Sequence, residues 1–547
     1  MNSLAPWTVV PIVLPLVTAA LLLLISDSRR RLGSLLNVVA TCAGLVTAMA
    51  LLWRVTVNGG PDAIAAHLTS NWAAPFGIAL VADRLSALLL VLVGVVALAV
   101  ALYAAAGWGR RGAYFHPLFQ IQLMGLNGAF LTGDLFNLFV FFEVMLAASY
   151  GLQLHGSGWP RVKSGMHYLA VNLLASSLFL VGLAVLYGVM GTLSMADVAA
   201  KVPLVPPADR GLLYAGAAIL AMAFLIKAAA WPLNAWLVPA YTAASAPVAA
   251  LFVLMTKVGV YAVLRLWMLV FPAQSDSATQ FGAPVLLSVG LATLAFGAAG
   301  VLASIRLDRI AAFSVIVTSG TLLAAFATGS PAAAAAALFY LVSSTFAVSA
   351  LFLLVEPVQR MRSEGQARNA QYDALPDEDD NLDDQQLPLV GRAFPVSVAT
   401  LGLAYLGGSL LVAGLPPLSG FLSKAALLTA IVATGNGTAT PTSTWVLMAL
   451  LLGSSLFATT ALVRAGIRHF WSKGGRFAPR LRLVESGSIL VLIGACLLLT
   501  VFAEPVLRYT TATAAYLHAP RPYVEAVFGT SPRPGPTSPE YPSVESP

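Results

Sequence analysis

Charged residues are scarce in this sequence. They make up 10% of its 547 residues, whereas 59% are hydrophobic, and a soluble domain carries about 25% charged residues. Cysteine is almost absent, because Cys42 and Cys496 are the only two and each lies within an apolar run. Two isolated cysteines exclude a disulfide framework and a thiolate metal site, so we expect plain core residues and no metal centre. The composition excludes an ordinary soluble domain.

Motifs of nucleotide and redox chemistry are also missing. The sequence contains no phosphate-binding loop, no dinucleotide fingerprint, no CxxC pair and no nucleophile elbow. A reaction driven by nucleotide hydrolysis or electron transfer within this chain is therefore unsupported. We predict that the protein is not an enzyme, that it holds no cofactor, and that an ion gradient or a partner supplies its energy.

Apolar runs recur along nearly the whole chain. Each is about 20 residues long, the length of helix that crosses about 30 Å of hydrocarbon. We count fourteen: 7–26, 33–55 and 84–106, then spans four to eight within 116–270, spans nine to thirteen within 283–470, and the last at 485–504. The first run has no basic region before it and is followed by Arg29, Arg30 and Arg31, which is typical of a retained span and not of a cleaved signal peptide. The sequence predicts an all-α polytopic membrane protein.

The spans divide the chain into five regions. We expect N-terminal helices 1–3 at 1–115, a first five-helix repeat at 116–270, a second repeat at 271–475, helix 14 at 476–505, and a flexible Pro-rich tail at 506–547. Within the second repeat, the stretch 373–384 carries seven acidic residues and no basic ones. It is expected to be a solvated cytoplasmic loop, and the alternative of calcium binding lacks the spacing of a calcium loop.

The formal charge of +7 could suggest an acidic partner such as nucleic acid, but the basic residues are sorted by loop. They follow the odd-numbered spans: Arg29 to Arg31, Arg110 and Arg111, Arg161 and Lys163, Arg306 and Arg309, Arg360 with Arg362 and Arg368, and Arg468, Lys473, Arg476, Arg480 and Arg482. Loops rich in Lys and Arg face the cytoplasm. We therefore expect no nucleic-acid partner, and a multi-pass membrane protein with both termini outside the cell.

Two segments, five spans apart, carry a proline inside an apolar helix with a lysine nearby. They begin at Pro232 and Pro417, close to Lys227 and Lys424. Proline removes a backbone hydrogen bond, and the freed polar groups are tolerated at membrane depth only in protein or beside a wet cavity. Because five is odd, successive five-span units insert with opposite orientation, so we predict inverted repeats with broken helices 7 and 12. The alternative is that each proline merely kinks a packed helix.

Four ionisable residues lie deep in apolar runs: Glu143, Lys227, Lys257 and Lys424. A charge at mid-membrane depth costs about 2.5–3.5 kcal/mol on insertion scales, and such residues usually serve ion or proton movement. Desolvation favours the neutral form of an amine and brings proton release within reach at neutral pH. We expect Glu143 and Lys227 to pair and the lysines to pass protons through water. A static Glu143–Lys227 salt bridge is the alternative, but it leaves Lys257 and Lys424 unexplained.

The runs Gly128–Tyr150 and Asn71–Ile78 are long and specific. They resemble the D subunits of Mrp-type multisubunit cation/proton antiporters, whose wider superfamily includes the antiporter-like proton-pumping subunits of respiratory complex I. The resemblance covers about residues 1–505. It implies a fourteen-helix fold with broken helices seven and twelve, assembly with the A, B, C, E, F and G types of Mrp subunit, and exchange of cytoplasmic Na+ for external H+.

The resemblance also assigns residues. It implies that Glu143 is the family's glutamate of helix five and that Lys227, Lys257 and Lys424 are its lysines of helices seven, eight and twelve. Where relatives often have histidine or lysine in helices ten and eleven, this chain has hydroxyl residues, at Ser314, Thr318, Ser343 and Ser344 among others. Hydroxyls hold water but do not store a proton, so we expect these four to line a hydrated path.

We expect a membrane-embedded subunit that moves protons along these four ionisable residues, in contact with lipid and coupled to Na+ export. One alternative is a proton-pumping membrane-arm subunit of a complex I-like NADH dehydrogenase or hydrogenase. Another is a structural scaffold whose charges only fix helix packing. Unchanged proton flux after replacement of Glu143 or Lys227 would favour the scaffold.

Overall fold

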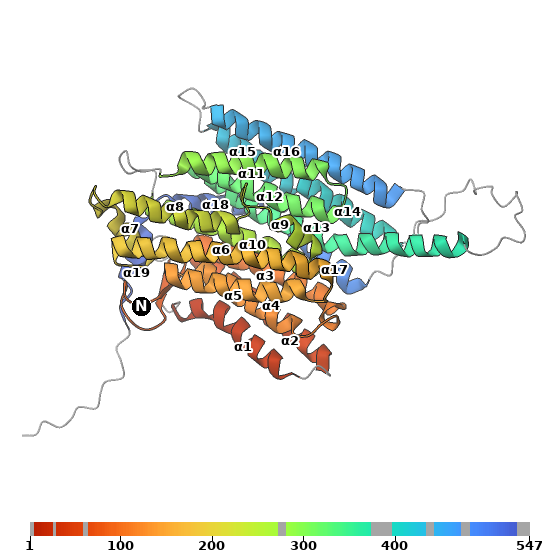
Figure 1. Ribbon diagram of the computed structural model, residues 1–547, viewed down its shortest axis with the longest axis horizontal. Helices are drawn as coiled ribbons and strands as arrows, with labels where there is room; N and C mark the ends of the chain where they lie inside the picture. The colour runs from red at the N-terminus through yellow and green to blue at the C-terminus, as the bar shows by residue number, and fades with distance from the viewer. Residues whose placement is uncertain are drawn as a thin grey trace, which may run out of the picture.

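The computed structural model describes residues 5–25, 29–57, 64–271, 281–373, 396–433, 442–471 and 482–532. Figure 1 shows the long helices lying side by side, with their axes close to the longest axis of the molecule. The first ten helices are α1 (Val10–Leu24), α2 (Arg30–Val57), α3 (Arg84–Ala105), α4 (Phe115–Leu131), α5 (Leu135–Leu154), α6 (Trp159–Met190), α7 (Met195–Lys201), α8 (Arg210–Lys227), α9 (Leu237–Ala243) and α10 (Ala246–Val270). The later ones are α11 (Ala283–Ala303), α12 (Leu307–Ala327), α13 (Pro331–Asp373), α14 (Val396–Ala413), α15 (Ser419–Ala433), α16 (Thr442–Gly466), α17 (Leu483–Val501), α18 (Ala503–Leu517) and α19 (Arg521–Phe528).

Thirteen of the described helices are long and apolar enough to cross a membrane. The apolar helix α4 has 17 residues. With α4 included, and with α8–α9 and α14–α15 each taken as one interrupted span, the helices match the fourteen runs expected from the sequence. Helices satisfy their own backbone hydrogen bonds, as the membrane interior demands. The all-α polytopic fold is confirmed, while the inverted relation of the two five-helix units stays a prediction.

The centre of the bundle is formed by α10, α12 and α13. Their most apolar windows are 94%, 89% and 100% buried, whereas those of α2 and α17 are only 28% buried. Helices that are apolar all round pack in the interior, and the outer ones turn apolar faces to lipid or to other proteins. Polar side chains on the three central helices are therefore removed from lipid.

Two spans are interrupted, as predicted. The first interruption separates α8 from α9, includes Pro232, and has Ala229 at a φ of +55°. The second separates α14 from α15, includes Pro417, and has Gly414 at a φ of +75°. The left-handed backbone after each half-helix ends its hydrogen-bonded ladder.

The two ends of the bundle differ. At one end, the antiparallel strands β1 (Ala65–Leu68) and β2 (Ala79–Ala82) lead into α3, whose N-cap is Asp83. At the other end, Arg111, Arg161 and Arg306 line one cavity together with Asp308 and Glu356. Basic residues that follow three different odd-numbered spans therefore gather at one end, as the sequence pattern requires.

The prediction of a flexible tail at 506–547 is wrong for the first part of that segment. Residues 503–517 and 521–528 form α18 and α19, which bury Thr510, Thr513, Leu517, Tyr523 and Val527. Their apolar and small residues recur at helical spacing, which the polar composition conceals. The rest of the tail, from 533, and the acidic stretch 374–384 lie outside the described residues.

The expectation that both cysteines are core residues is confirmed for Cys496 and wrong for Cys42. Cys496 on α17 is buried, but Cys42 is exposed. It lies on α2, one of the outermost helices, where an apolar residue can face lipid instead of the core.

Candidate functional site

The four predicted ionisable residues occupy the two interrupted spans and the helices beside them. Glu143 lies on α5, Lys227 is the last residue of α8, Lys257 lies in the middle of α10, and Lys424 lies on α15. Lys257 is fully buried and Lys424 is 7% exposed, whereas Glu143 and Lys227 are half-buried. All four lie within membrane-length segments, where water is scarce.

Glu143 accepts a hydrogen bond from the Ser176 hydroxyl of α6. No ion pair joins Glu143 directly to Lys227 in the part of the chain that the structure describes, although the two charges interact electrostatically. The Lys227 amine instead lies 5.8 Å from the centroid of the Phe142 ring. The structure brings the two residues near each other without the contact of a closed salt bridge. Ser176 was not predicted from the sequence, although a hydroxyl within an apolar span was a usable signal.

Lys227 ends α8 at the first interruption. The negative end of a helix favours a cation, so this position suits an ammonium group. The chain that follows is held by the Trp231 backbone N–H, which donates to Thr293 Oγ1 at 2.8 Å, and by Trp236 Nε1, which donates to the Ile226 carbonyl at 3.2 Å. The first bond places the interruption beside α11, and the second ties it back to the end of α8.

Lys257 has a hydroxyl as its partner. Its amine donates to Thr318 Oγ1 on α12 at 2.5 Å, and that hydroxyl donates in turn to the Val315 carbonyl at 2.8 Å. No acidic side chain among the described residues pairs with Lys257. A fully buried amine without a counter-ion is costly when charged, so this position favours an amine that changes protonation state.

Lys424 is held at the second interruption. Its amine donates to the Ala413 carbonyl at 3.0 Å and to Ser455 Oγ at 2.8 Å. Ala413 ends α14, where carbonyls lack helical partners and attract a cation. The Lys424 side chain also lies against Gly414, and a Cβ there would approach Lys424 Cδ to 2.7 Å. In the described part of the chain no acidic group pairs with Lys424.

A cavity connects the partner of Lys257 with Lys424. Its lining includes Ser314 and Thr318 of α12, Tyr340 and Ser344 of α13, and Lys424. About 20 Å3 is open to the centre of a water molecule, about what one water needs. The cavity gives polar groups on three helices access to a shared water.

The four predicted hydroxyls are only partly brought together. Ser314, Thr318 and Ser344 line the cavity, but Ser343 donates to Ser419 Oγ at 2.9 Å. Successive residues of a helix point about 100° apart, so Ser343 and Ser344 face different neighbours. Tyr340, Ser423 and Ser454 also line the cavity and were missed, although their hydroxyls lie within predicted spans.

This arrangement suits the movement of protons. Buried amines can bind and release protons, and hydroxyls with water can relay them between amines. Among the described residues, no group of three or more histidine, cysteine or carboxylate side chains could hold a metal ion.

Comparison with known proteins places the chain in a family. Residues 132–451 match the family described as NADH:quinone oxidoreductase/Mrp antiporter, TM. A protein of Rhizobium meliloti, named as the probable D-type subunit of a K(+)/H(+) antiporter, is 46% identical over 532 residues, which cover 96% of this chain and 98% of that protein. The D-type subunit of the Na(+)/H(+) antiporter of Alkalihalophilus pseudofirmus is 31% identical over 96% of this chain and 100% of its own length.

A solved structure agrees with these relatives. A chain in the structure of the Mrp complex from a Dietzia species superposes with a TM-score of 0.80 and 26% identity, covering 97% of this chain and 100% of that one. The chain therefore belongs to the NADH:quinone oxidoreductase/Mrp antiporter membrane family, and within it to the D-type antiporter subunits.

Proposed function

We propose that this chain is the proton-translocating subunit of a multisubunit antiporter that exchanges a monovalent cation for H+. The observation that carries the proposal is the pair of buried amines, Lys257 and Lys424, which have no acidic partner in the described part of the chain. Lys424 lines a cavity rich in hydroxyls, and Thr318, the hydrogen-bond partner of Lys257, lines the same cavity. A static salt bridge cannot account for either amine. Proton loading and unloading can, because it removes the buried charge for part of the cycle.

The route runs through both interruptions. Glu143, held by Ser176, and Lys227 form its first stage, with the carboxylate stabilising the charged amine. The proton then reaches Lys257, and from there the hydroxyls of Thr318, Ser314 and Ser344 lead toward Lys424. Water in the cavity carries the proton between the last two amines, since hydroxyls alone do not store it.

The orientation of the protein in the membrane follows from the distribution of its basic residues. The end that gathers Arg111, Arg161 and Arg306 faces the cytoplasm by the distribution of basic residues. Both termini then lie outside a bacterial cell membrane, and the protein exports a cation in exchange for external H+. Of the relatives, one is named for K+ and the other for Na+, so both ions belong in the assay.

The partners follow from the relatives. The relatives are named as subunits of antiporters, so we propose that this chain acts in a complex with the other Mrp subunit types. It carries no nucleotide or redox motif of its own. The similarity to antiporter D subunits extends over the whole length of those proteins. It favours this function over a membrane-arm subunit of a complex I-like NADH dehydrogenase or hydrogenase.

The test is cation exchange by the whole complex in inverted vesicles, followed with a pH-sensitive dye after addition of Na+ or K+. The parent is expected to show cation-dependent proton movement. Lys424→Met removes the amine but keeps most of the volume, and it is expected to slow exchange at least about tenfold. Lys201→Met is the matched control, because Lys201 pairs with Asp197 outside the predicted route. Parent-like exchange by an assembled Lys424→Met complex would contradict the proposal.

Thr318→Val should also slow exchange. It keeps the shape of the side chain but removes the hydroxyl that accepts from Lys257, and loss of a hydrogen bond to a charged group is expected to cost about tenfold in rate. Thr318→Ser retains the hydroxyl and should retain most of the exchange. Equal rates for the valine and serine variants would remove Thr318 from the route.

A further inference from the structure

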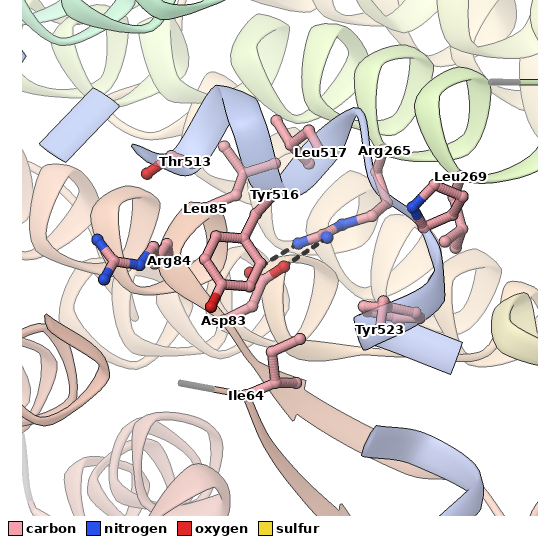
Figure 2. A pocket seen from close by; sticks show the side chains of 11 residues that line it. Ile64, Asp83, Arg84, Leu85, Arg265, Leu269, Thr513, Tyr516, Leu517 and Tyr523 are labelled. Atoms are coloured by element: carbon pink, nitrogen blue, oxygen red, sulfur yellow. Dashed lines mark hydrogen bonds and ion pairs between the residues drawn. The ribbon is translucent and has the colours of Figure 1, made fainter. Parts of the chain in front are cut away.

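A buried ion pair lies at the outer end of α10. Arg265 donates to both carboxylate oxygens of Asp83, at 2.5 and 2.8 Å, and to Ser86 Oγ at 3.3 Å. Asp83 is 9% exposed and Arg265 is 5% exposed. The proposed route does not use either residue. Figure 2 shows the guanidinium pointing at the carboxylate, with Tyr516 and Tyr523 beside them.

The two C-terminal helices cover this pair. Tyr516 and Leu517 of α18 and Tyr523 of α19 line a cavity around it. Tyr523 stacks with the Arg265 guanidinium at 5.4 Å, and Tyr516 stacks with that of Arg84 at 5.6 Å. Such cation–π contacts hold a covering segment without fixing it covalently. The pair is therefore covered by two C-terminal helices, of which α18 packs against α13 and α19 packs against α7.

A polar stripe joins the pair to the centre of the molecule. Lys257, Tyr261 and Arg265 follow one another at intervals of four residues on α10, so they lie on one face of the helix, about 12 Å from end to end. Arg265 Nε donates to the Tyr261 hydroxyl at 3.3 Å, and that hydroxyl donates to the Phe130 carbonyl at 3.1 Å. Among the described residues, hydrogen bonds link Arg265 to Tyr261 but not Tyr261 to Lys257, which lies one helical turn further along.

We infer that the Asp83–Arg265 ion pair, covered by α18 and α19, is the outer gate of the proton route along α10, and that Asp83 receives the external proton. The inference rests on the proposed function and gives Lys257 a second entry for protons, beside the stage formed by Glu143 and Lys227. A proton that binds Asp83 cancels the carboxylate charge and releases Arg265. The pair opens, water enters along the stripe, and the proton moves on through Tyr261 to Lys257.

The charges around Asp83 keep the pair closed at neutral pH. Burial raises the pKa of Asp83, but the charge and the hydrogen bonds of Arg265 outweigh burial and bring that pKa below its ordinary value. The other titratable groups that act on this cluster are Tyr261 of α10, Tyr509 of α18, Tyr523 of α19, Arg84 of α3 and Asp134. A depressed carboxyl pKa keeps the pair intact at neutral pH, and the pair is lost as pH falls. The gate is therefore closed while Asp83 is ionised, and it opens only when Asp83 is protonated.

The experiment measures cation exchange by the whole complex at a fixed internal pH while the external pH is varied. The parent is expected to exchange faster as the external pH falls. Asp83→Asn is expected to flatten that profile and to slow exchange at low external pH by about tenfold. Asp83→Glu keeps an acid and should keep the dependence with a shifted midpoint. Glu504→Gln is the matched control, because it breaks an exposed ion pair with Arg508 on α18 and should leave the profile unchanged.

A second measurement tests closure directly. Ser86→Cys places a thiol beside the pair in a chain that also carries Cys42→Ser and Cys496→Ser. A membrane-impermeant thiol reagent added outside should label position 86 slowly in this chain, and at least about ten times faster once Asp83→Asn removes the charge that holds Arg265. Mass spectrometry of the chain reports the labelling.

The outcomes separate this inference from the proposed function. A parent-like pH profile in Asp83→Asn overturns the gate, and so does slow labelling of position 86 in that variant. Should Asp83→Asn fail to assemble, Asp83→Glu decides, because an unshifted profile in that variant overturns the gate equally. Loss of exchange in Lys424→Met together with a parent-like Asp83→Asn profile would refute the gate alone, whereas parent-like exchange in both would refute the proposed function as well.

Discussion

Replacing Lys257 with methionine is expected to abolish most cation-dependent proton exchange, a loss of about a hundredfold, while the complex still assembles. Methionine fills most of the space of the lysine stem with an apolar side chain. The amine that it removes is fully buried, bonded to Thr318, and without an acidic partner among the described residues. The route then has no proton-binding group between Lys227 and Lys424, and hydroxyls cannot replace it.

Thr256→Val is the matched control for this prediction. Thr256 precedes Lys257 on α10 and is equally buried. Within the described ranges of the chain, its hydroxyl donates only to the Val253 carbonyl of its own helix, at 3.0 Å. Its replacement changes a buried polar side chain of α10 without touching the route, so exchange should stay near that of the parent. Dye-quench assays with Na+ and with K+ measure both variants. If Lys257→Met assembled and exchanged like Thr256→Val, protons would not pass through Lys257.

Features with a local cause could be predicted from the sequence. Long apolar runs force helices because the membrane interior leaves the backbone no other partner. The two interruptions followed from Pro232 and Pro417, since proline removes one hydrogen bond wherever it stands within a helix. The depth of Lys257 and Lys424 followed from their place within the runs, and the structure confirms that both are buried.

Features that depend on which helices meet could not be predicted. Arg265 and Asp83 are 182 residues apart in the sequence, and no periodicity indicates that the ends of α3 and α10 touch. The same holds for Ser176 and Glu143, which lie on different helices. A hydropathy pattern tells which residues lie in a span but not which neighbour each one faces, so Ser343 and Ser344 could not be separated before the packing was known.

The C-terminal helices escaped prediction for another reason. Their sequence is polar and interrupted by prolines, which is typical of an unstructured tail. The structure nevertheless buries Thr510 and Thr513, because threonine hydroxyls bond to carbonyls of their own helix, here those of Leu507 and Tyr509. A helix can therefore bury residues that a composition count scores as polar.

Gly259→Ala is expected to have the largest effect on assembly. Gly259 lies two residues beyond Lys257 on α10, where a Cβ would approach the Ala228 backbone nitrogen to 2.5 Å and the Lys227 carbonyl carbon to 2.8 Å. Small residues let helices approach closely in membranes, and here they bring α10 against the first interruption. Backbone atoms cannot rotate away from an added methyl group, so α10 and the interruption must separate, at a cost of about 1–3 kcal/mol.

The separation would also move Lys227 away from Lys257, so both a lower midpoint of thermal unfolding and a strongly reduced exchange rate are expected for Gly259→Ala. Gly494→Ala on α17 is the matched control, because no atom lies within 4 Å of a Cβ built there. Gly420→Ala should behave like Gly259→Ala at the second interruption, where a Cβ would meet the Leu411 carbonyl oxygen. The amount of complex recovered by size-exclusion chromatography, its unfolding midpoint and its exchange rate measure all three. A Gly259→Ala complex that matched Gly494→Ala in each would show that the contact between α10 and the first interruption is not what sets the spacing of the two amines.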